Sequence, residues 1–218
     1  MQGDSIVIEP HHRQAASEIA QALKSAIQQR QDRVAITIAG ESGSGKSETA
    51  AALKEALEAI GIVAVILQQD DYFIYPPRSN DAARRRDIGW VGPGEVKLDL
   101  MDEHLRAFLD GADRLDKPLV IYERDTIGAE TMDCSAARVM IAEGTYTTLL
   151  KSADWRVFIA RDWEQTRAHR EKRRRDDSEL DPFIDQVLSI EHSIISQHRS
   201  LADFVIESDY SVTGQEAD

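Results

Sequence analysis

The sequence predicts an α/β fold, in which a mostly parallel β-sheet is covered by helices on both faces. Apolar runs typical of buried strands alternate with helical segments through the first half of the chain. Residues 33–40 form a continuous β-branched and apolar run, as expected of a strand buried on both faces. A glycine-rich loop, an Ala- and Glu-rich helix at 47–61 and a second apolar run at 62–67 follow. This order predicts a βαβ unit.

The other elements are predicted from the same patterns. Before this unit we expect a short strand at 5–9 and a helix at 15–29. After it we expect a loop at 68–90, a helix at 98–110, a strand at 118–124, a turn at 126–136, strands at 137–144 and 155–160, and a charged helix at 163–174. A helix at 182–197, a strand at 202–208 and a frayed tail after residue 210 complete the prediction.

The composition excludes several classes of partner. The 218 residues carry a net charge of −13, which disfavours nonspecific binding to nucleic acid or to an anionic membrane. The longest apolar run, at 60–67, is too short to span a bilayer, and no export signal is visible. The lone cysteine, Cys134, cannot form an internal disulfide. We therefore expect a cytoplasmic protein without a nucleic-acid or membrane partner, and a homodimer as the default assembly.

The phosphate-binding signature G-x-x-x-x-G-K-[ST] follows the first strand of the βαβ unit. Its residues are Gly40, Glu41, Ser42, Gly43, Ser44, Gly45, Lys46 and Ser47. Glycine lets successive N–H groups turn toward one anion, and the next helix adds the positive end of its dipole. Lys46 is expected to reach the β- and γ-phosphates of a nucleotide and Ser47 to bind Mg²⁺, with Glu48 in the same nucleotide site. The alternative, a chance match in a Gly/Ser-rich turn, is disfavoured by the flanking strand and helix.

Carboxylates end two of the predicted strands, at the edge where open α/β sheets bind ligands. Asp70 and Asp71 follow the second strand, and Glu143 ends a later one. A carboxylate there can accept the proton of an acceptor hydroxyl, and we assign this role to Asp70. A role as a loop or helix cap explains Asp71 equally well. Glu143 is predicted to hold Mg²⁺ together with Ser47, and a surface turn is the alternative.

An arginine-rich segment follows the strand at 155–160. Arg167, Arg170 and Arg174 lie at helical spacing along one side of the predicted helix. If that side closes over the nucleotide, they can neutralise charge on the transferred group. The alternative is a solvated charged helix, because acidic residues are interspersed among the arginines.

Together these regions resemble the uridine kinase and phosphoribulokinase family, and the resemblance covers most of the chain. The matching segments are GESGSGKS at 40–47, QQDDYF at 68–73, AEG at 142–144 and TRAHREKRRRDD at 166–177. The resemblance implies one P-loop NTPase domain of three αβα layers over residues 1–218, with an acceptor-binding insertion at about 72–134 and a helical lid at about 163–182.

The resemblance also implies ATP and Mg²⁺ as cofactors. It gives Asp70 the catalytic-base position and Glu143 the magnesium-associated position. Arg170 and Arg174 take the lid positions, so Arg170 is expected on the nucleotide and Arg174, with Lys46, at the transferred phosphoryl group.

The acceptor is harder to predict. The segment IYERDTIGAET lacks the Tyr-Asp pair and the histidine usual in uridine kinases, which disfavours pyrimidine nucleosides. Arginines at 78 and 84–86 are able to hold an anionic acceptor, although a solvated loop explains them equally well. We expect an ATP- and Mg²⁺-dependent kinase acting on a hydroxyl of a small metabolite. The alternatives are a true uridine or cytidine kinase and a P-loop ATPase or switch protein that acts on a partner.

Overall fold

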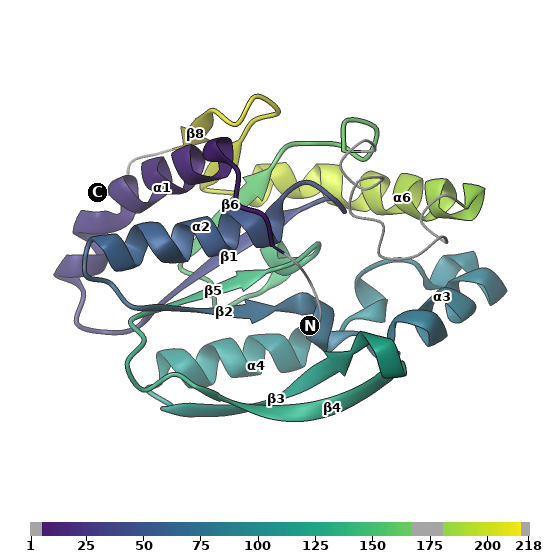
Figure 1. Cartoon of the computed structure of the whole chain (residues 1–218), viewed down its shortest axis with the longest axis horizontal. Coiled ribbons are helices and arrows are strands. Elements are labelled where there is room, and N and C mark those ends of the chain that lie inside the picture. Colours follow the sequence, from purple (N-terminus) through teal and green to yellow (C-terminus); the bar gives the residue numbers. More distant parts are fainter. Residues whose placement is uncertain (1–5, 167–180, 215–218) are drawn as a thin grey trace.

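A six-stranded sheet of order β2-β5-β1-β6-β7-β8 lies at the centre of the computed structural model, which describes residues 6–166 and 181–214 (Figure 1). Its strands are β1 (Val34–Gly40), β2 (Ala64–Gln68), β5 (Val139–Glu143), β6 (Trp155–Ile159), β7 (Phe204–Ile206) and β8 (Val212–Gly214). All neighbouring pairs are parallel except β7 and β8. The predicted α/β class with a mostly parallel sheet is therefore confirmed.

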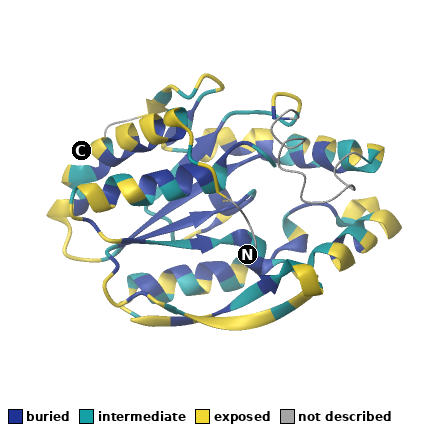
Figure 2. Ribbon diagram, in the orientation of Figure 1, coloured by how far each residue is buried: buried dark blue, intermediate teal, exposed yellow. Residues whose placement is uncertain are grey.

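Helices cover both faces of this sheet, and the central strand β1 shows why. All seven of its residues are buried, so alternate side chains must enter two different cores. Ile36 and Ile38 pack with α1 (Pro10–Gln29) and α2 (Lys46–Ala59), the two helices on the upper face in Figure 1. Ala35 and Ala39 belong to the other core, with α4 (Leu98–Leu109) and the end of α6 (Pro182–Ile195). Figure 2 shows the buried strands between the helical layers.

A separate antiparallel hairpin forms the lower edge of the molecule in Figure 1. It consists of β3 (Arg114–Ile121) and β4 (Thr126–Asp133). The prediction of a turn at 126–136 is wrong, because β4 is exposed along most of its length and has no apolar run that would mark it. Backbone pairing with β3 makes it a strand.

Other predictions also need correction. Residues 6–9 form no strand, and α1 instead begins at Pro10, where Glu9 and His12 make a capping box. The predicted loop at 68–90 contains α3 (Pro77–Arg86), which a proline in its first turn initiates. Residues 212–214 of the predicted frayed tail pair as β8, and residues 163–166 form a turn. The rest of the predicted arginine-rich helix, up to residue 174, lies outside the described residues.

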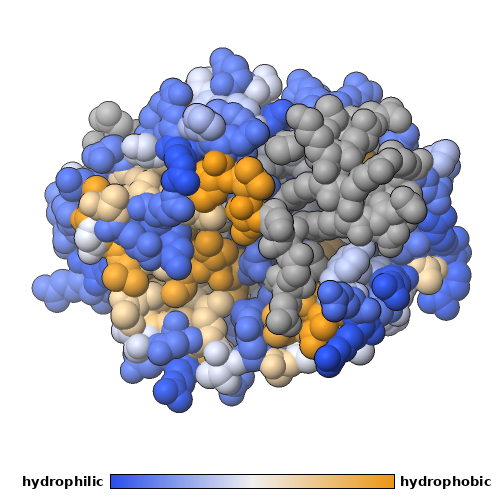
Figure 3. Space-filling model, in the orientation of Figure 1, coloured by the Kyte–Doolittle hydropathy of each residue, from blue (hydrophilic) through white to orange (hydrophobic). Residues whose placement is uncertain are grey.

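The surface in the same view is largely hydrophilic, with apolar atoms gathered toward its middle (Figure 3). The large apolar side chains that remain exposed are Ile6, Val7, Val63, Ile74, Tyr75, Ile88, Leu149 and Leu201. Among the described residues, no helix has the length and apolar character that crossing a bilayer requires.

Candidate active site

The glycine-rich loop joins the carboxyl end of β1 to the first turn of α2. Gly45 has a φ of +96°, and a Cβ atom on it would lie 2.9 Å from Nε2 of the buried His12. A side chain is therefore excluded there by both the backbone conformation and the space. The Nζ atom of Lys46 donates to the carbonyl oxygen of Glu41 at 2.9 Å, so the ammonium group lies over the loop itself.

Glu143 ends β5 beside this loop and contacts it directly. The Ser47 hydroxyl donates to its Oε1 atom at 3.1 Å, and the Gln68 amide approaches the same oxygen at 3.4 Å. Burial raises the pKa of Glu143 to about 7, with a further contribution from the negative charge of Asp70, while Lys46 acts in the opposite direction. Four predicted site residues from three separate segments, Lys46 and Ser47, Asp70, and Glu143, are therefore brought together around the Glu143 carboxylate.

This set of oxygen donors fits Mg²⁺. The ion is commonly held in kinases by one or two carboxylates together with substrate phosphates, at a site that keeps several waters. Ser47 and Glu143 supply a hydroxyl and a carboxylate already in contact. A cation at this point would relieve the burial and the repulsion from Asp70 that now disfavour ionised Glu143.

Gln69 holds the ends of β2 and β5 together. Its Oε1 atom accepts a hydrogen bond from the backbone N–H of Tyr146 at 2.7 Å. Its side chain lies so close to Gly144 that a Cβ atom on this glycine would be 2.2 Å from the Cβ of Gln69. The glycine after Glu143 is therefore required by close packing, and this packing sets the separation of Glu143 from Asp70.

The two neighbouring aspartates have different surroundings. Asp71 is buried and forms an ion pair with Nζ of Lys117 at 2.7 Å, while its other oxygen accepts from the backbone N–H of Val120 at 3.0 Å. It therefore attaches the β3–β4 hairpin to the end of β2. Asp70 is half-buried beside Glu143.

The geometry can now be compared with known proteins. The family model described as "Phosphoribulokinase / Uridine kinase family" matches residues 35–189, which is more than half of the chain. The chain belongs to this family. It is therefore a kinase, a phosphotransferase that acts on a hydroxyl, and the predicted family resemblance is confirmed.

A curated relative and several solved structures resemble this kinase. The chain is 32% identical over 197 residues to the "Bifunctional alpha-galactosidase/sucrose kinase AgaSK" of Mediterraneibacter gnavus, a match that covers 85% of the chain and 21% of that protein. The chain thus spans about a fifth of the relative's length.

The solved structures bear on the fold of the kinase. A putative fructose transport system kinase from Silicibacter sp. TM1040 aligns with a TM-score of 0.62 at 20% identity, over 85% of this chain and 93% of that one. A possible uridine kinase from Bacillus stearothermophilus aligns with a TM-score of 0.55 at 20% identity, over 86% of this chain and 98% of that one. D-glycerate 3-kinase from Cryptococcus neoformans aligns with a TM-score of 0.60 at 12% identity, over 96% of this chain and 100% of that one. These likenesses establish the αβα P-loop kinase fold.

Glu41, the second residue of the loop, connects the kinase's phosphate site to distant segments. Its carboxylate lies 2.6 Å from Nδ1 of His192 on α6 and accepts from the backbone N–H of Trp163 at 2.7 Å. The Thr166 hydroxyl donates to the carbonyl oxygen of Ser42 at 3.0 Å. The start of the predicted lid is therefore attached to the loop, whereas Arg170 and Arg174 lie outside the described residues.

Sequence reasoning missed two of the residues that contact the loop. The sequence does not single out His12 or His192, because no spacing relates them to the phosphate signature. Both reach the loop from helices that are distant along the chain. Only the packing of α1 and α6 against the loop reveals them.

Two of the arginines of α3, Arg84 and Arg85, are paired with carboxylates of the kinase itself. Arg84 makes a bidentate contact with Glu95, at 2.6 and 3.0 Å, and reaches Glu191 of α6 at 3.1 Å. Arg85 contacts Asp81 at 2.8 Å and Asp181 at 2.7 Å. Neither of these two guanidiniums is a free anion site, which disfavours, of the two alternatives left open by the sequence, an anionic acceptor held by Arg84 or Arg85.

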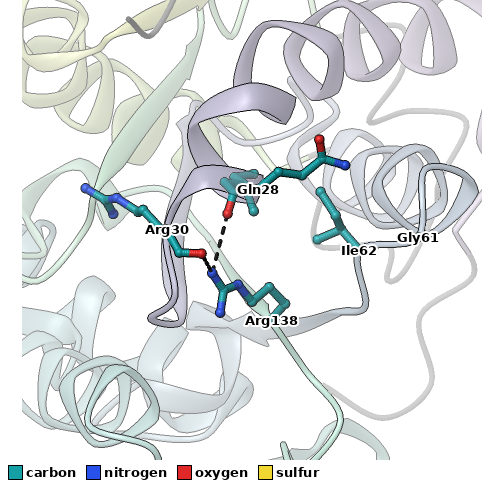
Figure 4. Close-up of a pocket in the computed structure, with 6 residues that line it drawn as sticks. Gln28, Arg30, Gly61, Ile62 and Arg138 are labelled. Carbon is teal, nitrogen blue, oxygen red and sulfur yellow. Dashed lines mark hydrogen bonds between the residues drawn. The ribbon is translucent and has the colours of Figure 1, made fainter.

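A pocket of about 240 Å³ lies at the opposite edge of the sheet, where β2 and β5 begin (Figure 4). It is lined by Ile27, Gln28, Arg30, Gly61, Ile62 and Arg138. The Arg138 guanidinium donates to the carbonyl oxygens of Ile27 and Arg30, near the end of α1. This arginine therefore satisfies carbonyls that the helix leaves unpaired, and the pocket is remote from the phosphate loop.

Proposed function

We propose that this chain is an ATP- and Mg²⁺-dependent kinase that transfers the γ-phosphoryl group to a hydroxyl of a neutral carbohydrate. The relative that is 32% identical carries "sucrose kinase" in its name, and the match covers 85% of this chain. A sucrose-like sugar is therefore the first acceptor to test.

The observation that carries the neutral acceptor is the pairing of the α3 arginines. A phosphate or carboxylate on the acceptor needs guanidinium or ammonium groups that are not already engaged. Arg84 and Arg85 are engaged by four carboxylates of the chain itself, those of Glu95, Glu191, Asp81 and Asp181. An anionic acceptor bound by Arg84 or Arg85 would have to displace these carboxylates, and two of them, those of Glu95 and Glu191, are buried.

The donor half of the reaction follows from the loop. The backbone N–H groups and Lys46 bind the β- and γ-phosphates, and the first turn of α2 adds its dipole. Ser47 and Glu143 hold Mg²⁺, which neutralises phosphate charge when it is bound. Lid arginines Arg170 and Arg174 stabilise the charge on the transferred group.

Asp70 acts on the acceptor half. Its half-buried carboxylate accepts the proton of the attacking hydroxyl and holds that oxygen in line with the γ-phosphate. The neighbouring Asp71 is less suited to this role, because both of its oxygens are used by Lys117 and Val120.

An acceptor screen tests the proposal. ADP release is measured with sucrose, fructose, uridine, D-glycerate and a pentose phosphate, with and without Mg²⁺. We expect Mg²⁺-dependent turnover that requires an added sugar. ADP release without any acceptor would instead support an ATPase. A preference for uridine would support a nucleoside kinase. Preference for glycerate or the pentose phosphate would contradict the charge argument.

A further inference from the structure

Two fully buried tyrosines differ in what their hydroxyl groups contact. Tyr72 is 0% exposed, and its hydroxyl lies 2.7 Å from Nδ1 of His104 on α4. Tyr146 is 1% exposed, and its hydroxyl has no hydrogen-bond partner among the described residues. An unpaired buried hydroxyl is unfavourable for stability, so its retention calls for an explanation.

The surroundings of the Tyr146 hydroxyl are polar and charged. Burial raises its pKa, and the negative charges of Glu191 and Glu95 add to the rise, whereas Arg84 opposes it. The Arg84 guanidinium joins Glu95 of the η3 turn (Pro93–Glu95) to Glu191 of α6. These three charged groups are therefore near enough to act on the unpaired hydroxyl of Tyr146. Figure 1 shows α3 and α6 on the same side of the molecule, where this ion pair bridges them.

The cluster lies next to the phosphoryl-transfer site. Burial raises the pKa of Glu191, while Arg84 lowers it and the loop lysine Lys46 also contributes as a nearby cation. The backbone N–H of Tyr146 is held by Gln69, which directly precedes Asp70. The cluster is thus tied to both the donor lysine and the proposed base. The Arg84 side chain keeps 16% exposure, so part of the cluster reaches the surface of the molecule.

We infer that Tyr146, Glu191 and Arg84 bind a hydroxyl of the acceptor sugar beside the one that is phosphorylated; this rests on the proposed function. A sugar hydroxyl both donates and accepts. It donates to the Glu191 carboxylate, and it accepts from the Tyr146 hydroxyl or the Arg84 guanidinium.

The same cluster disfavours an anionic group. Two carboxylates, those of Glu95 and Glu191, face one guanidinium, so a phosphate or carboxylate placed here would be repelled by both and would compete with them for Arg84. Selectivity for a neutral polyol therefore follows from the same residues that bind it.

Tyr146→Phe is the decisive variant, and Tyr72→Phe is its matched control. Loss of the Tyr146 hydroxyl removes no hydrogen bond among the described residues, so the melting temperature should not fall. The KM for sucrose should rise about tenfold, as expected for one lost hydrogen bond, with the KM for ATP unchanged. Tyr72→Phe loses its partner His104 and should lower the melting temperature while leaving the KM for sucrose unchanged. Glu191→Gln, which keeps the shape of the side chain, should also raise the KM for sucrose.

The outcomes separate the two proposals. An unchanged KM for sucrose in both Tyr146→Phe and Glu191→Gln would overturn the inferred hydroxyl site while leaving the proposed function intact. If the unaltered chain phosphorylates no neutral sugar in the acceptor screen, the proposed function fails and the site fails with it. Equal loss of stability in the two tyrosine variants, with no change in KM, would show that Tyr146 has only a structural role.

Discussion

The donor and acceptor sides of this kinase are built in different ways. The proposed donor side centres on one continuous segment, Gly40–Ser47, which carries the phosphate-binding signature. The proposed acceptor side is assembled from residues far apart along the chain, such as Arg84, Tyr146 and Glu191. Phosphate binding can therefore be encoded locally, whereas acceptor choice depends on how α3 and α6 pack against the sheet.

The largest effect is expected from Asp70→Asn, because the proposed role of Asp70 is to hold the acceptor hydroxyl in line with the phosphate of the donor. The variant should bind ATP normally, because the loop is untouched, while turnover of the acceptor falls by about 10²- to 10⁴-fold. Steady-state ADP release and calorimetric titration with a non-hydrolysable ATP analogue measure the two quantities. Turnover close to that of the unaltered chain would remove Asp70 from the mechanism.

Asp71→Asn tests the contrast between the two adjacent aspartates. Removing one charge of the buried Asp71–Lys117 pair should lower the free energy of unfolding by about 3 kcal/mol. Lys117 retains Glu130 at 2.5 Å, which limits the loss. Urea denaturation of Asp71→Asn and Asp70→Asn compares their stabilities. Asp70→Asn should unfold at nearly the same urea concentration as the unaltered chain. If Asp70→Asn were instead the less stable of the two variants, the roles that we assign to Asp70 and Asp71 would be reversed.

A pH titration tests the donor side through Glu143. Because its pKa is raised from 4.5 to about 7 in the fold, its contribution to stability is present below pH 4.5 and is lost as the pH rises through 7. Metal-free protein should therefore lose up to about 3 kcal/mol over this range relative to Glu143→Gln. Denaturation at a series of pH values measures the difference, and identical pH profiles would contradict it.

The same pH titration in the presence of nucleotide measures a second quantity, the apparent affinity for Mg²⁺. Mg²⁺ binding requires the ionised carboxylate, so the apparent affinity for Mg²⁺ should increase as the pH rises toward 7. Glu143→Gln should abolish this trend.

The smallest effect is expected from Arg85→Ala. Its contacts with Asp81 and Asp181 are exposed, and exposed ion pairs contribute little to stability. We expect no measurable change in melting temperature or in the KM for sucrose. The neighbouring Arg84→Ala should impair both, because it leaves buried Glu95 and Glu191 without their cation. If Arg84→Ala and Arg85→Ala changed the melting temperature and the KM for sucrose equally, this would contradict our assignment of Arg85 to surface ion pairs and of Arg84 to the binding cluster.

Elements with a strong local pattern were predictable. The strand β1 and the helix α2 lie within a residue or two of their predicted bounds, because both carry uninterrupted apolar or helix-forming sequence. The helix α3 was missed because its sequence is polar and it starts at a pair of prolines, Pro76 and Pro77. The strand β4 was missed because it is exposed and depends on pairing with β3.

The sequence by itself determined the phosphate loop and the carboxylates at the ends of two strands. Such signals are local, since glycine, lysine and serine at fixed spacing suffice to specify an anion site. Only the tertiary structure decided that Asp71 is used by Lys117, that Arg84 is paired with Glu95 and Glu191, and that Tyr146 lies among them. The physical reason is that charge pairing and burial depend on distances between segments, which spacing along the chain does not specify.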